Sequence, residues 1–313
     1  MSRAKGEIQS VLIAGPTASG KSGLALALAR ACHGAVVNAD SMQVYAGLQI
    51  VTARPSAADL DVAEHRLYGH VRPGEEYSVG AWSRDVATVL SELGQRGRMP
   101  IICGGTGLYF RALLGGIDDM PAVPPEIRAA WRQRLIEEGP DSLHDELLKR
   151  DPEAGQRIRP GDTQRVLRAL EIVEVSGGPL AALQRGRGVP LLDPERTLKI
   201  LLTPPRPVLR ENIARRFDMM IAAGAVAEVE AFADLPGALA GPAGKAIGVA
   251  ELHDHLAGSK SLEEARERAV TRSRQYAKRQ ETWFRHQFDS SWQRVVALSQ
   301  SDRQLLIDAV KTG

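Results

Sequence analysis

The feature that most constrains this chain is a glycine-rich segment near its start, residues 15–22, with the sequence GPTASGKS. Two glycines five positions apart, followed by Lys21 and Ser22, match the spacing of a loop that wraps a polyphosphate. The apolar run VLIA at 11–14 predicts a buried parallel strand before the loop, and LALALA at 24–29 predicts a helix after it. This order favours a phosphate-binding loop over the alternative, a glycine-rich surface turn. It also predicts an α/β fold with a parallel sheet.

Such a loop binds phosphate through its backbone and through two side chains. Its glycines let N–H groups face the phosphate oxygens, and the positive end of the following helix adds a partial charge. Lys21 supplies a full charge, and the Ser22 hydroxyl is a ligand for Mg²⁺. The predicted phosphate-binding residues are Gly15, Pro16, Thr17, Ala18, Ser19, Gly20, Lys21 and Ser22. The motif alone leaves open which compound is held and whether it is cleaved.

Composition excludes several classes of protein. The chain has 313 residues, enough for one large α/β domain that carries a smaller one, and its net charge of +2 does not by itself indicate a nucleic-acid partner. Cys32 and Cys103 lie in or beside apolar segments without a pairing pattern, which predicts buried reduced thiols in a cytoplasmic protein. Residues 1–10 are polar and no apolar run has the length of a membrane span, so neither secretion nor membrane insertion is expected.

The order of apolar runs predicts how the chain is divided. Strand-like runs occur at 11–14, 35–39, 100–103 and 198–202, whereas 121–190 is rich in Arg and Glu with helical apolar spacing. We therefore expect a core of residues 1–116 and 196–313, interrupted by a helical insertion domain at 117–195. The part from 208 to 288 is expected to be helical, with a break between Pro236 and Gly248.

Two residues follow neighbouring strands of the expected sheet, where ligands bind in parallel sheets. Asp40 follows the second strand, and its carboxylate could bind Mg²⁺, orient a nucleophile or accept a proton, or simply cap a helix. Thr106 follows the strand at 101–103, after two glycines, where an ATPase usually has an acid. This argues against ordinary ATP hydrolysis, although a plain strand-to-helix turn remains an alternative for Thr106.

Six segments, in this order, resemble the bacterial tRNA dimethylallyltransferase family: GPTASGKS, NADSMQVY, GGTGLYF, DTQRVLRALE, ARRFDMMIAAG and RQYAKRQETWF. The resemblance extends over roughly residues 10 to 290. It implies a P-loop NTPase-like parallel sheet flanked by helices, with a helical insertion and a helical C-terminal part. It also implies Mg²⁺-dependent transfer of a dimethylallyl group from dimethylallyl diphosphate to N6 of the adenosine 3′-adjacent to the anticodon of tRNA, with release of diphosphate.

The resemblance assigns roles residue by residue. Asp40 matches the general base, Thr106 the pocket threonine, and Arg216 an arginine that points toward the diphosphate. The segments matching those that contact tRNA contain Asp40, Ser41, Met42, Gln43, Thr106, Arg128, Gln164, Arg165, Val166, Leu167 and Arg168. The expected partners are the anticodon stem-loop of tRNA and dimethylallyl diphosphate, and a monomer is expected.

The segment from Arg266 to His286 indicates a nucleic-acid surface, because it has seven Lys or Arg against two Glu and interleaved aromatic residues. A solvated face with an aromatic edge in the core is the alternative. This chain also departs from the family pattern: Val249 and Ala250 stand where Tyr and a basic residue are usual, and Val51 replaces a usual glycine. Whether the segment 245–250 contacts tRNA therefore stays open.

Three other functions fit parts of the pattern. A small-molecule kinase would use the same loop for ATP, but the missing acid after Cys103 counts against it. A non-catalytic RNA-binding protein would leave Asp40, Thr106 and the phosphate loop without a purpose. An enzyme that prenylates free adenine nucleotides would need neither the insertion nor the basic C-terminal helix.

Overall fold

The chain contains two compact units. The computed structural model describes residues 7–116, 118, 120–183 and 188–312. Contacts group residues 1–114 with 191–313 in the larger unit and residues 115–190 in the smaller one. The insertion boundaries at 117 and 195 stay predictions, and residue 117 lies outside the described residues, as do residues 1–6 of the polar N-terminal segment.

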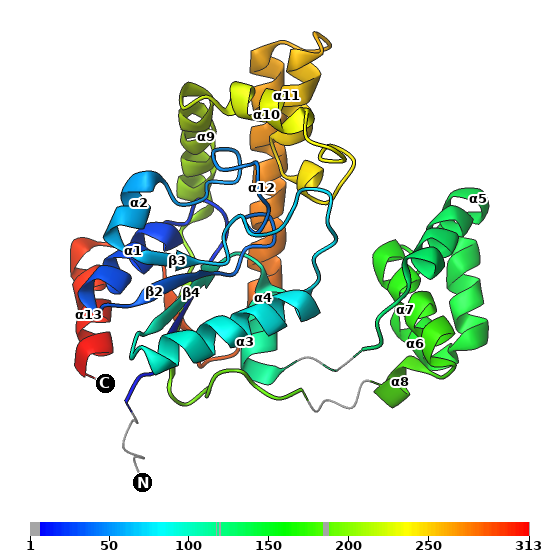
Figure 1. Ribbon diagram of the computed structural model, residues 1–313, viewed down its shortest axis with the longest axis horizontal. Coiled ribbons are helices and arrows are strands. Elements are labelled where there is room, and N and C mark those ends of the chain that lie inside the picture. Colours follow the sequence, from blue (N-terminus) through cyan, green and yellow to red (C-terminus); the bar gives the residue numbers. More distant parts are fainter. Residues whose placement is uncertain (1–6, 117, 119, 184–187, 313) are drawn as a thin grey trace. The chain divides into compact units, whose positions relative to one another are not determined.

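The larger unit is built on a parallel sheet of six strands in the order β3-β2-β4-β1-β5-β6. Strands β2, β3 and β4 are labelled in Figure 1. The strands are β1 (Ser10–Ala14), β2 (Ala35–Asn38), β3 (Glu64–Arg66), β4 (Pro100–Gly104), β5 (Thr197–Leu202) and β6 (Gln293–Val295). In the register, Ala14 pairs with Gly104, and Asn38 pairs with Cys103. The segments that follow β1, β2 and β4 therefore leave the sheet side by side, at the carboxyl ends of these strands.

All four predicted strands are present, and the predicted α/β fold is confirmed. The strands β3 and β6 were not predicted, because EHR and QRV are three-residue polar segments without an apolar run. Both lie at the edges of the sheet, where one side of the strand remains open and polar side chains are tolerated.

Different helices cover the two faces of the sheet (Figure 1). Val11 and Ile13 of β1 pack on one face, and Leu12 and Ala14 pack on the other, as the alternation of side chains along a strand requires. The first face carries α1 (Lys21–Ala31) and α13 (Gln300–Thr312). The second carries α3 (Val79–Gln95), α4 (Gly107–Gly115), α9 (Arg206–Ala222) and α12 (Leu262–Gln287). The helices α10 (Ala225–Ala233) and α11 (Val249–Leu256) extend the same hydrophobic cluster and pack on α9 and α12. Two short helices, α2 (Ala57–Val62) and η1 (Ala243–Lys245), lie in the connections.

The described part of the smaller unit contains helices and no strand. These helices are α5 (Pro125–Arg150), α6 (Pro152–Arg157), α7 (Thr163–Ser176) and α8 (Leu180–Leu183). They enclose a hydrophobic core of their own, with Trp131, Leu143 and Leu170 at its centre. The helix α5 is kinked at Gly139, whose φ of 83° is not helical and which precedes Pro140.

Both cysteines are free thiols, as predicted. Cys103 is buried, whereas Cys32 is only half-buried and donates its S–H to the Leu28 carbonyl at 3.0 Å. In the part of the chain that the structure describes, no helix is both long enough and apolar enough to cross a membrane.

Candidate active site

The phosphate loop lies between β1 and α1, where its sequence predicted it. Gly20 precedes α1 with a φ of 90°, a left-handed conformation that costs little without a Cβ. The Lys21 ammonium folds back over the loop and donates to the Pro16 carbonyl at 3.2 Å. The Ser19 hydroxyl is buried without a hydrogen-bond partner among the described residues. A buried hydroxyl of this kind is costly unless a ligand satisfies it.

Two cations share this site with one carboxylate. Arg216 of α9 donates through Nη2 to the Thr17 hydroxyl at 2.5 Å. Burial lowers the pKa of Lys21, and its neighbours Cys103 and Asp40 offset that only in part. Burial also lowers the pKa of Arg216, and Asp40 again opposes the shift. Two desolvated cations beside a single carboxylate leave a site that an anionic ligand would neutralise.

Asp40 is held by the turn that follows β2. Its Oδ1 accepts the N–H of Met42 at 2.9 Å, and the next helix, α2, begins only at residue 57, so Asp40 does not cap a helix. Its Oδ2 has no hydrogen-bond partner in the described part of the chain. One carboxylate oxygen therefore anchors the turn, and the other remains for a ligand.

Asn38 holds the backbone of Asp40 in place, a role that the sequence reasoning missed. The Asn38 side chain accepts the Asp40 N–H at 2.8 Å and donates to the Asp40 carbonyl at 3.0 Å and to the Leu67 carbonyl at 3.0 Å. Trp82 donates its indole N–H to the Asn38 carbonyl at 3.0 Å. The available signal was a polar residue inside the run AVVNA, and Asn38 is indeed fully buried.

Thr106 ties the end of β4 to the Asp40 turn. Its Oγ1 accepts the N–H of Ser41 at 2.9 Å, and its own N–H donates to the Ala39 carbonyl at 3.1 Å. Although α4 begins directly after Thr106, the side chain serves this neighbouring turn rather than its own helix. Because the hydroxyl oxygen already acts as an acceptor, its O–H is available to donate to a ligand.

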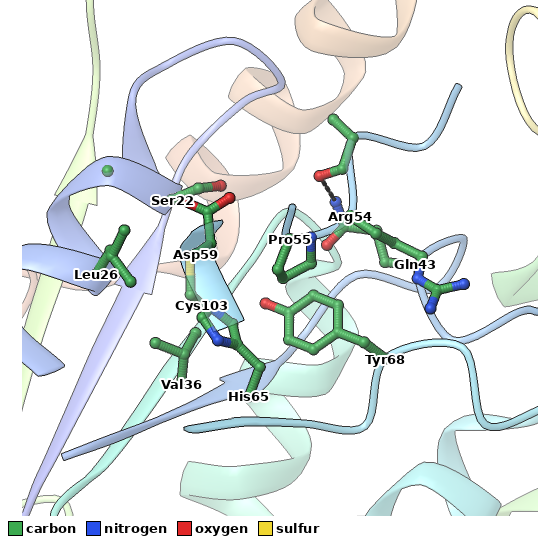
Figure 2. Close-up of a pocket in the computed structure, with 12 residues that line it drawn as sticks. Ser22, Leu26, Val36, Gln43, Arg54, Pro55, Asp59, His65, Tyr68 and Cys103 are labelled. Carbon is green, nitrogen blue, oxygen red and sulfur yellow. Dashed lines mark hydrogen bonds between the residues drawn. The ribbon is translucent and has the colours of Figure 1, made fainter. Parts of the chain in front are cut away.

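A cavity of about 60 Å³ joins these groups. Its lining residues are Thr17, Lys21, Ser22, Asp40, Gln43, Thr52, Ala53, Tyr68, Cys103, Gly104 and Arg216. A second cavity of about 100 Å³ shares five of these residues, including Ser22 and Tyr68 (Figure 2). Figure 2 shows the Tyr68 hydroxyl directed into the second cavity. The phosphate-loop residues Thr17, Lys21 and Ser22 therefore line one cavity with Asp40 and Arg216. Thr106 lines neither cavity and contacts the site through the Ser41 N–H.

The site suits a magnesium ion that is held mainly by its substrate. The described residues contain no group of three or more His, Cys, Asp or Glu side chains that could hold a metal. Magnesium bound to phosphate compounds keeps several waters and needs only one or two protein ligands. The Ser22 hydroxyl and the Asp40 carboxylate line the same cavity as Lys21, and both are hard oxygen donors.

The other residues predicted to contact RNA lie in two places. Ser41, Met42 and Gln43 belong to the turn after β2, and the Gln43 amide donates to the carbonyls of Thr52 at 2.8 Å and Ala53 at 2.9 Å. Arg128 is on α5, and five predicted residues are on α7: Gln164, Arg165, Val166, Leu167 and Arg168.

Within α7, the five residues differ in exposure. Arg165 is exposed and pairs with Asp162 at 3.3 Å, and Arg168 pairs with Glu171 at 3.3 Å. Val166, by contrast, is buried in the core of the smaller unit. Its side chain therefore has a packing role and offers no surface to RNA.

The basic helix α12 has fewer free cations than its composition indicates. Arg266 pairs with Asp218 at 2.5 Å, Arg268 pairs with Asp254 at 3.0 Å, and Arg272 pairs with the buried Glu251. Arg279 lies over the Tyr276 ring at 5.6 Å. Part of the charge thus fastens α12 to α9 and α11.

Gln280 of α12 also reaches the site, and the sequence reasoning did not identify it. Its Oε1 accepts the N–H of Thr17 at 2.9 Å, and its Nε2 donates to the Gly105 carbonyl at 3.0 Å. The N–H of Thr17 is therefore directed at Gln280 rather than toward a phosphate. No local pattern marks Gln280, because its partners lie 263 and 175 positions away in the sequence.

Comparisons with known proteins agree with this geometry. A model of the IPP transferase family matches residues 43–287. The tRNA dimethylallyltransferase of Agrobacterium fabrum is 52% identical over 286 residues, which cover 91% of this chain and 96% of that protein. The tRNA dimethylallyltransferase of Rhizobium meliloti is 50% identical over 289 residues, with coverage of 92% and 95%.

Solved structures give the same result. The full-length tRNA isopentenylpyrophosphate transferase of Bacillus halodurans matches with a TM-score of 0.67 and 33% identity, covering 98% of this chain and 96% of that one. A eukaryotic dimethylallyltransferase acting on tRNA matches with a TM-score of 0.81 and 28% identity, covering 97% of this chain and 78% of that one. The resemblance seen in the sequence is confirmed, and the chain belongs to the IPP transferase family.

Proposed function

We propose that this protein transfers the dimethylallyl group of dimethylallyl diphosphate to N6 of the adenosine 3′-adjacent to the anticodon in tRNA, releasing diphosphate. The observation that carries the proposal is the cavity in which Lys21 and Arg216 face Asp40. The end of β4 adds support, because it carries Gly-Gly-Thr in place of the acid that ATP hydrolysis uses. The named relatives make tRNA the acceptor to test first.

The leaving group explains the two cations. When the bond between the allylic carbon and oxygen breaks, negative charge grows on the diphosphate, and Lys21 and Arg216 stabilise it. The allyl group spreads the positive charge that remains, which favours a loose, cation-like transition state. A diphosphate that leaves intact needs groups that bind it, whereas hydrolysis of a nucleotide would also need a group that activates water.

The acceptor explains the carboxylate and the hydroxyl. An amine conjugated to a purine is a weak nucleophile, so removal of its proton by Asp40 favours attack on the allylic carbon. In this proposal the free O–H of Thr106 donates to the base or to the departing oxygen. The target adenosine lies in a stacked loop and must be drawn out into the cavity.

Magnesium has a supporting role in this scheme. Ser22, together with the diphosphate oxygens, would hold the ion, which when bound neutralises charge on the leaving group. We further propose that the turn after β2 and residues Gln164, Arg165 and Arg168 of α7 contact the anticodon stem-loop, together with Arg128 of α5 in the same unit. The protein acts in this scheme as a cytoplasmic monomer.

One experiment separates this function from its rivals. The protein is incubated with Mg²⁺ and dimethylallyl diphosphate labelled in the prenyl group, together with tRNA, AMP, or a tRNA whose target adenosine is replaced by guanosine. We expect label in the unaltered tRNA only. Label in AMP alone would identify an enzyme acting on free nucleotides, and ATP-dependent phosphorylation of a small acceptor without prenyl transfer would identify a kinase.

A further inference from the structure

One buried amide connects the two halves of the site. Gln280 is 5% exposed and lies on α12, far in sequence from both loops that it contacts. Its Oε1 accepts the Thr17 N–H at 2.9 Å, and its Nε2 donates to the Gly105 carbonyl at 3.0 Å. Both polar ends of the side chain are thus used, one on each loop.

The two loops carry different parts of the proposed reaction. Thr17 belongs to the phosphate loop, and its hydroxyl accepts a hydrogen bond from Arg216. It therefore lies on the side of the site that would hold the leaving diphosphate. Gly105 precedes Thr106 and lies beside the carboxylate of Asp40: a Cβ added at Gly105 would come within 3.5 Å of Asp40 Oδ2. Gln280 therefore joins the leaving-group side to the acceptor side.

The loop after β4 is shaped to admit this amide. A Cβ added at Gly105 would lie only 2.2 Å from Gln280 Nε2, so any larger residue there would displace the amide. Gly105 does not have a positive φ, so its backbone conformation is open to alanine. The obstacle to alanine at this position is the steric clash with the Gln280 side chain. The glycine at 105 is thus explained by the side chain it faces.

We propose that Gln280 is a positioning residue that sets the separation between the diphosphate and the acceptor amine; this rests on the function proposed above. The reacting atoms must approach to about 3–3.5 Å in line, and misplacement by about 1 Å can cost about 100-fold in rate. The Gln280 amide supplies both an acceptor for the Thr17 N–H and a donor for the Gly105 carbonyl, whereas alanine and methionine side chains supply no N–H donor. Gln280 touches neither reacting atom and acts through the two loops.

The test compares Gln280→Ala and the volume-preserving Gln280→Met with Gln287→Ala. Gln287 lies two turns further along the same helix and is exposed. For both Gln280 variants we expect kcat to fall about 10- to 100-fold, while KM for dimethylallyl diphosphate and for tRNA changes less than about 3-fold. Gln287→Ala should match the wild type. A loss that appears only in KM, or only as a lower melting temperature with normal kcat per folded enzyme, would overturn the proposal.

A double-mutant cycle adds a readout that a purely structural role would not produce. Gly105→Ala should lower kcat by displacing the amide, and combining it with Gln280→Ala should cost no more than Gln280→Ala alone. Additive losses would contradict the proposal. Wild-type protein that prenylates no tRNA would instead refute the proposed function, so the two failures are distinguishable.

Discussion

At the scale of single residues, Asp40 has the central role in the proposed reaction. We expect Asp40→Ala to slow the chemical step by about 10²- to 10⁴-fold, as loss of a general base does, with tRNA affinity nearly unchanged. Single-turnover prenylation and a filter-binding titration with tRNA measure the two quantities separately. If tRNA binding is lost while the rate of bound complex is retained, Asp40 reads the base and does not take its proton.

Lys21 gives a prediction about pH. Burial lowers its pKa in the free protein, and a bound diphosphate would raise it, so binding favours the protonated lysine. The contribution of Lys21 is therefore complete below its free-protein pKa, declines above that value, and is lost as the pH rises through the higher pKa of the complex. Lys21→Met should weaken diphosphate binding about 10- to 100-fold at neutral pH, since a charged hydrogen bond contributes about 1.5–3 kcal/mol.

The matching measurement is calorimetric titration with inorganic diphosphate across the alkaline range. The ratio of the two dissociation constants, variant to wild type, should shrink as the pH rises, and taking the ratio cancels the ionisation of the ligand itself. A ratio that stays constant up to the ordinary lysine pKa of 10.5 would show that Lys21 is not desolvated in solution.

At the scale of elements, α13 supports the helix that follows the phosphate loop. Leu306 of α13 is 3% exposed and belongs to the hydrophobic cluster that α1 forms with one face of the sheet. Leu306→Ala should lower the free energy of unfolding by about 2–5 kcal/mol, the usual cost of such a cavity. Urea unfolding measures this, with the exposed Leu305→Ala as the control. Equal stability of the two variants would show that α13 does not pack on α1.

The elements also show what a sequence reveals and what it does not. Long apolar runs such as VLIA predicted the central strands, because burial on both faces of a parallel sheet demands them. The edge strands β3 and β6 could not be predicted, because polar three-residue segments have no periodic pattern of apolar residues. Asp40 and Thr106 could be predicted because they follow recognisable strands, and Asn38 is marked only as a polar residue in an apolar run. Gln280, by contrast, acts through distant partners that only the folded chain brings together.

At the scale of the whole molecule, recognition of tRNA should be separable from catalysis. The Arg165 side chain is 76% exposed and lies in the smaller unit, whereas Lys21 and Asp40 belong to the larger one. Arg165→Ala should weaken tRNA binding. The slope of the logarithm of the binding constant against the logarithm of the salt concentration should become shallower by about 0.7–0.9, the effect of losing one phosphate contact. The equally charged Arg134→Ala, in α5, is the control. Unchanged affinity in Arg165→Ala would remove α7 from the proposed tRNA surface.

The central claim is that the phosphate loop holds a leaving diphosphate rather than a nucleotide to be hydrolysed. The most direct test counts products in one reaction with tRNA, Mg²⁺ and dimethylallyl diphosphate, without ATP. We predict one intact diphosphate for each N6-dimethylallyladenosine formed, with no inorganic phosphate. Release of inorganic phosphate in step with prenylation, or a strict requirement for ATP, would contradict the claim.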